Sequence, residues 1–116
     1  MDIAIIKYNA GNIYSVAFAL KRLGINPVIT ADKELIQKAD KVIFPGVGEA
    51  YTTMEYLKEH KMTELIRNLK QPVLGVCLGM QLMCRHSEEG NADCLGIFDV
   101  DVRRFHPLCH EDKVPV

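Results

Sequence analysis

The chain has 116 residues, of which 48% are hydrophobic and 25% are charged, and its formal net charge is −1. This length allows one small domain, and the composition excludes the collagen-like, coiled-coil and intrinsically disordered classes. The balanced charge gives no electrostatic reason to expect a nucleic acid or an anionic membrane as a partner.

The predicted elements alternate between strands and helices along the chain. Apolar runs bounded by turn residues predict four strands, at residues 2–8, 27–30, 42–44 and 73–76. Between and after them, apolar side chains recur at helical spacing over residues 13–23, 32–39, 54–69 and 78–85, with Asp32 as a candidate cap. The alternation predicts an α/β fold, in which a mostly parallel sheet is wound with helices on both faces.

The pattern weakens after Glu89. Residues 95–105 alternate in a way that favours an exposed, antiparallel strand. The last three residues, Val114, Pro115 and Val116, resemble the start of a strand more than a polar tail. We therefore expect residues 1–116 to be the amino-terminal portion of a single domain whose carboxy-terminal part is missing.

The four cysteines and the amino-terminal residues indicate the cellular compartment of the protein. The cysteines, at positions 77, 84, 94 and 109, form no C-x-x-C pair, which favours free thiols in a reducing compartment. No apolar run approaches the length that crosses a membrane, and the short, acidic start indicates a buried strand instead of a signal peptide. A cytoplasmic location is therefore expected.

The candidate chemistry lies in loops that follow predicted strands, at residues 9–12, at 45–48 and around Cys77. Ligands of open α/β sheets collect at this edge. Residues 75–79 (GVCLG) match G-x-C-x-G between a strand and a helix, which is a nucleophile elbow with cysteine in place of serine. Such a turn presents the sulfur above a helix start, where the thiolate is favoured, and aims the N–H of Leu78 at a developing oxyanion. A buried, inert cysteine and a merely tight 45–48 loop remain the alternatives.

Residues 75–82 (GVCLGMQL) resemble the active-site signature of class I, or triad-type, glutamine amidotransferases. Residues 45–48 (PGVG) resemble the oxyanion loop of the same family. Residues 11–16 (GNIYSV), together with 87–89 (SEE), narrow the resemblance to the glutaminase subunits of imidazole glycerol phosphate synthases, which act in histidine biosynthesis. The resemblance runs from Asp2 to about Lys113, so the chain would be the amino-terminal portion of a single glutamine amidotransferase domain.

The resemblance implies an activity and a set of site residues. Cys77 would attack the amide of glutamine, release ammonia and leave a glutamyl thioester that water hydrolyses. The backbone N–H groups of Val47 and Leu78 would hold the oxyanion. The implied substrate-binding residues are Gly46, Gly48, Gln81 and Glu89. The alternative for the two polar ones is an exposed helix residue at Gln81 and a solvated helix-end acid at Glu89. A carboxylate at Glu89 can pair with an α-ammonium group, and the amide at Gln81 offers a donor and an acceptor.

The resemblance also implies a partner. Ammonia would pass to the cyclase subunit of imidazole glycerol phosphate synthase, docked over the carboxyl edge of the sheet, with Gly11 and Asn12 as candidate contacts. No cofactor motif is visible, and the cluster of His106, Cys109 and His110 is weak support for a metal site. The alternatives are an amidotransferase of anthranilate or aminodeoxychorismate synthesis, a non-catalytic α/β binding module, and an α/β hydrolase with cysteine for serine.

The catalytic base is missing from this pattern. A nucleophilic cysteine needs a histidine to move its proton and an acid to orient that histidine. The family takes both from a His-x-Glu segment far downstream, and none follows at such a distance here. His106 sits in a similar Phe-His-Pro context, but Leu108 replaces the acid and the segment comes too early, while His60 lies in a charged, surface-type run. We therefore expect this chain alone to hydrolyse glutamine slowly or not at all.

Overall fold

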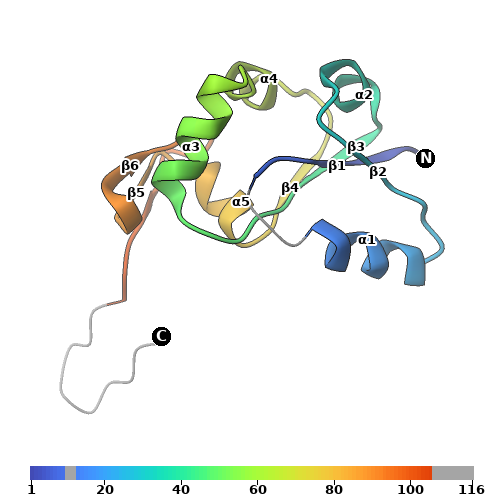
Figure 1. Ribbon diagram of the computed structural model, residues 1–116, viewed down its shortest axis with the longest axis horizontal. Helices are drawn as coiled ribbons and strands as arrows, with labels where there is room; N and C mark the ends of the chain where they lie inside the picture. The colour runs from blue at the N-terminus through green and yellow to red at the C-terminus, as the bar shows by residue number, and fades with distance from the viewer. Residues whose placement is uncertain (10–12, 106–116) are drawn as a thin grey trace, which may run out of the picture.

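A four-stranded parallel sheet organises the computed structural model, which describes residues 1–9 and 13–105 (Figure 1). The strands are β1 (Ile3–Ile6), β2 (Val28–Thr30), β3 (Lys41–Phe44) and β4 (Val73–Gly75), in the order β2-β1-β3-β4. All neighbours are parallel, and Ile5 lies opposite both Ile29 and Ile43. The carboxyl ends of β1, β3 and β4 therefore meet at one edge of the sheet, where the loops predicted to carry the chemistry begin.

Helices cover both faces of this sheet, as the sequence predicts (Figure 1). One face packs against α1 (Ile13–Arg22), through a cluster that includes Ile3 and Ile5. Alternate residues of β1, Ala4 and Ile6, belong to the larger cluster on the other face. That face is covered by α2 (Lys33–Lys38), α3 (Ala50–Glu59), α4 (Thr63–Arg67) and α5 (Leu78–Leu82). The α/β prediction is confirmed, and β1 is apolar throughout because both of its faces are buried.

The helical region predicted over residues 54–69 is two helices and not one. The α3 helix ends at a Schellman motif, in which Lys61 adopts a left-handed φ of 57°. The N–H of Met62 donates to the Leu57 carbonyl at 2.8 Å, and the N–H of Lys61 donates to Lys58 at 3.1 Å. This motif usually contains glycine, so a lysine in its place gave no sign of the break. No helix among the described residues is long and apolar enough to cross a membrane.

The strand predicted over residues 95–105 is wrong in extent and direction. Only Asp101–Val102 forms a strand there (β7), and it runs parallel to β5 (His86–Ser87), while β6 (Ala92–Asp93) pairs antiparallel on the other side. The preceding segment turns back over the end of α5 and donates backbone N–H groups to that helix end at 2.8–2.9 Å, from Leu95 to Leu82, from Gly96 to Cys84 and from Phe98 to Met83. Carbonyls at a helix end need such partners, so the segment caps α5 instead of extending a sheet.

Candidate active site

Cys77 occupies the sharp turn between β4 and α5, and it is exposed. Its backbone has φ 53° and ψ −120°, a combination that costs a non-glycine residue strain and that persists only where the surroundings enforce it. The carbonyl of Cys77 accepts from the N–H of Gln81 at 3.1 Å, which closes the first turn of the helix. The interpretation of Cys77 as a buried apolar residue is therefore wrong, and the residue lies at a helix start on the carboxyl edge of the sheet.

The glycines on either side of Cys77 allow close packing that a side chain would prevent. A Cβ placed on Gly79 would overlap the carbonyl oxygen of Phe44 and lie 2.8 Å from that of Pro45. A Cβ on Gly75 would lie 2.7 Å from the Cα of Met80. Glycine at position 79 lets the start of α5 press against the end of β3, and glycine at position 75 lets α5 pack against the end of β4. The cysteine turn and the 45–48 loop are therefore held side by side.

The 45–48 loop contacts the cysteine turn through the donor predicted to bind an oxyanion. The N–H of Leu78 donates to the carbonyl of Gly46 at 3.0 Å, and the N–H of Val76 donates to Phe44 at 3.0 Å. The first of these bonds occupies the Leu78 donor. A rotation of the single peptide between Gly46 and Val47 would turn that carbonyl away and aim the Val47 N–H at the same space. Such a rotation changes ψ of Gly46 and φ of Val47, and glycine at the first of these positions tolerates a wide range of backbone angles.

The predicted substrate-binding side chains come from two further elements. Gln81 is half-buried on α5, one turn after Cys77. Glu89 is exposed on the short 3-10 helix η1 (Glu89–Asn91), which packs against the start of α3. A Cβ on Gly90 would overlap the carboxylate of Glu49, the residue after Gly48. The fold therefore brings the Glu89 segment to the end of the 45–48 loop, across about forty residues of sequence. The predicted partner contacts Gly11 and Asn12 lie outside the described residues.

Glu49 is a site neighbour that the sequence analysis missed. Its carboxylate caps α3, accepting from the N–H of Tyr51 at 2.7 Å and from the N–H of Thr52 at 3.0 Å. These backbone hydrogen bonds hold the pKa of Glu49 below its ordinary value, so its negative charge stays beside Gly48. The helical region predicted from residue 54 in fact begins at Ala50, so the sequence analysis did not recognise the acidic residue before it as a cap.

The two histidines that the structure describes are engaged elsewhere. The ring of His60 stacks on Tyr56 with centroids 3.9 Å apart, and its Nδ1 lies 2.9 Å from the Tyr56 carbonyl oxygen. His86 begins a His-x-Glu triplet, residues 86–88, close after the nucleophile, which the sequence analysis overlooked. Its Nδ1 lies 2.9 Å from a carboxylate oxygen of Asp93 on the neighbouring strand. Neither imidazole pairs with Cys77, and His106, Cys109 and His110 lie outside the described residues.

The cysteines should differ sharply in their rates of alkylation. Burial raises the pKa of the Cys94 thiol to about 11 and raises that of Cys84 above its ordinary value. Because the thiolate is the reactive form, iodoacetamide at about pH 7.5 should modify exposed Cys77 first. Modification of Cys94 should accelerate about tenfold per pH unit until the pH reaches its pKa. Peptide mass spectrometry of a Cys109→Ser chain measures these rates, and equal labelling of Cys77 and Cys94 at neutral pH would contradict the prediction.

Comparisons with known proteins bear on the family of this chain. A family model described as the CobB/CobQ-like glutamine amidotransferase domain matches residues 2–106. The chain is 72% identical to the imidazole glycerol phosphate synthase subunit HisH of Bacteroides thetaiotaomicron and 70% identical to that of Bacteroides fragilis, each over 99% of this chain and 59% of the relative. The corresponding subunit of Idiomarina loihiensis is 46% identical over 95% of this chain and 58% of the relative. The chain thus spans about three fifths of the length of these relatives.

A solved structure gives independent support for the fold. A crystal structure of a glutamine amidotransferase aligns with a TM-score of 0.70 and 22% identity, covering 85% of this chain and 54% of that chain. This likeness concerns the fold alone. The resemblance predicted from the residues around Cys77 and from the 45–48 loop is confirmed by the family and sequence matches.

Proposed function

The chain belongs to the family of CobB/CobQ-like glutamine amidotransferase domains, and from that premise we propose that Cys77 is the nucleophile of a glutaminase reaction. One observation carries the proposal: Cys77 is exposed on a strained turn between a strand and a helix, directly beside the 45–48 loop. Backbone strain at one exposed, potentially nucleophilic residue is typical of a functional site.

The proposed reaction proceeds through a thioester. The Cys77 thiolate attacks the side-chain amide carbon of glutamine, and the electron pair of the C=O bond moves to oxygen, where backbone donors hold it. The intermediate collapses, the C–N bond breaks, and the nitrogen takes the proton that the Cys77 thiol gave up to the catalytic base of the complete protein, so that it leaves as ammonia. Water then attacks the thioester and releases glutamate and the thiol. The oxyanion donors are Leu78 and Val47, once the peptide between Gly46 and Val47 has rotated to release the Leu78 N–H.

The substrate pocket is proposed at the same edge. The carboxylate of Glu89 would pair with the α-ammonium of glutamine, and Gln81 would hydrogen-bond the substrate from α5. Gly46 and Gly48 would line the loop side. The open space lies at Gly48, where a Cβ would meet only Leu78, at 4.0 Å, whereas the space beside Gly46 is filled by the Tyr8 hydroxyl. The packing of η1 against the start of α3 supports this, because it places the Glu89 segment next to the loop.

The ammonia acceptor is proposed from the names of the relatives. They are subunits of imidazole glycerol phosphate synthase, so this chain would deliver ammonia to a cyclase subunit in histidine biosynthesis. The cyclase would dock over the carboxyl edge of the sheet and contact Gly11 and Asn12. Complementation of a histidine auxotroph by the complete gene tests the pathway. Growth restored only in an anthranilate or aminodeoxychorismate auxotroph would identify a different amidotransferase.

The 116-residue chain by itself should hydrolyse glutamine slowly or not at all. Both described histidines are engaged away from Cys77, and a cysteine without its base loses most of its reactivity toward amides. A steady-state assay of ammonia release measures this. Normal turnover by the isolated chain would refute the prediction and direct attention to His106. If a glutamine-mimicking diazo-ketone fails to label Cys77 even in the complete protein, the non-catalytic binding module is favoured.

A further inference from the structure

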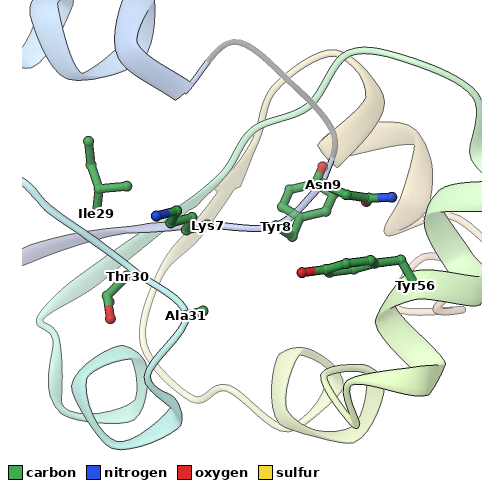
Figure 2. Close-up of a pocket in the computed structure, with 7 residues that line it drawn as sticks. All are labelled: Lys7, Tyr8, Asn9, Ile29, Thr30, Ala31 and Tyr56. Atoms are coloured by element: carbon green, nitrogen blue, oxygen red, sulfur yellow. The ribbon is translucent and has the colours of Figure 1, made fainter.

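Tyr8 lines a surface groove (Figure 2) and is hydrogen-bonded to the first residue of the 45–48 loop. The residue follows β1 and is 7% exposed, and its ring centroid lies 5.3 Å from that of Phe44. One side of Tyr8 lines a groove of about 410 Å³, which also borders Asn9 and Tyr56. Its hydroxyl reaches away from the groove and donates to the carbonyl of Pro45, in a bond that is buried.

The loop is held at both ends. At its beginning, the Tyr8 hydroxyl binds the Pro45 carbonyl and lies so close to Gly46 that a Cβ there would overlap it. At its far end, the cap made by Glu49 fixes the start of α3. The peptide between Gly46 and Val47 lies between these two anchors. It carries the carbonyl that accepts from the Leu78 N–H.

We propose that Tyr8 is a positioning residue for the oxyanion loop, because its hydroxyl fixes the Pro45 carbonyl and confines movement of the loop to the peptide between Gly46 and Val47. This inference rests on the proposed glutaminase function. A single rotating peptide switches between two states, one closed on Leu78 and one open to an oxyanion. A loop released at Pro45 samples more arrangements, and fewer of them place the Val47 donor correctly.

The Tyr8 hydroxyl can keep this role throughout the assay range. Burial raises the pKa of Tyr8 well above the ordinary value for a phenol, so the group stays protonated and remains a donor at neutral and mildly alkaline pH. The Pro45 carbonyl lies in a buried setting, and loss of its donor leaves an acceptor unpaired. The loop therefore has a thermodynamic reason to move when the hydroxyl is removed.

Replacing Tyr8 with phenylalanine tests the proposal. The substitution keeps the ring packed on Phe44 and removes only the donor. In the complete protein with its partner, Y8F should lower kcat for glutamine about tenfold and leave KM unchanged, because the oxyanion contact forms only in the transition state. Tyr56→Phe is the matched control: its ring lines the same groove, and its hydroxyl makes no hydrogen bond to a described residue, so kcat should be unchanged.

Two further measurements keep the outcome decisive. The rate of Cys77 alkylation should be equal in Y8F and the unmodified protein, which shows that the cysteine turn is intact. A double-mutant cycle compares Y8F, Gly46→Ala and the variant that carries both substitutions. The loss of unfolding free energy in the double variant should be smaller than the sum of the two single losses, because Y8F removes the atom that the new methyl group would overlap. Additive losses, or an unchanged kcat in Y8F, would overturn the proposal for Tyr8. Absence of glutaminase activity in the unmodified complete protein would instead overturn the proposed function.

Discussion

Replacing Cys77 with alanine should reduce glutamine hydrolysis by the complete protein by about 10⁴-fold or more, because no thioester can form. The fold should survive, since the side chain is exposed. Cys77→Ser should be nearly as inactive, because a hydroxyl is far harder to ionise than a thiol. Ammonia release in steady state measures the loss, and circular dichroism checks the fold.

Cys94→Ala is the control for this experiment. The Cys94 thiol is half-buried, its pKa is about 11, and it bonds only weakly to the Ala92 carbonyl, at 3.6 Å. Its loss should leave turnover within about twofold. Retention of more than about a tenth of the activity by Cys77→Ala would show that the nucleophile lies elsewhere.

Replacing Gly79 with alanine should have the largest effect on stability, a loss of about 3 kcal/mol or more in the free energy of unfolding. The new methyl group would overlap the Phe44 carbonyl oxygen, a backbone atom that already accepts from the Val76 N–H at 3.0 Å. A backbone atom bound within the sheet cannot move aside as a flexible side chain can. Urea denaturation followed by circular dichroism measures the loss.

Gly24→Ala separates steric overlap from backbone strain. Gly24 has φ 83°, but a Cβ there would meet nothing within 4 Å. Alanine at this position should cost only about 1 kcal/mol, from the left-handed backbone alone. Equal losses in the two variants would mean that the cysteine turn can separate from β3 without penalty, which would contradict the tight packing described for Gly79.

Local sequence patterns predicted the strands and helices of the α/β fold and the turn that carries Cys77. Parallel strands covered on both faces are apolar along their length, so β1 and β3 were visible in the sequence. Asp32 was predicted to cap a short helix, and its carboxylate does accept from the N–H of Glu34 at 2.9 Å. The G-x-C-x-G spacing around Cys77 predicted a strand-to-helix turn for the same local reason. Each of these features depends on residues that are neighbours in the chain.

The features that were not predicted depend on contacts between residues that are far apart in the sequence. Residues 95–98 cap the end of α5 because the chain returns there, and no local pattern records that return. The hydrogen bond from the Leu78 N–H to the Gly46 carbonyl joins two loops thirty-two residues apart. The sequence therefore predicted the donor, but it could not show that this donor is already hydrogen-bonded. Tyr8 was counted as the last residue of an apolar strand, and its hydroxyl gained a role only when Pro45 was placed beside it.

The left-handed backbone at Cys77 brings thermal stability and catalytic activity into conflict. A residue with a side chain is held there against its own conformational preference, at a cost of about 1–3 kcal/mol, whereas glycine would adopt the geometry freely. A laboratory screen for heat resistance alone would therefore reward loss of the sulfur and enrich an inert descendant. Any programme of directed evolution on this scaffold should couple each round of thermal challenge to a measured release of ammonia.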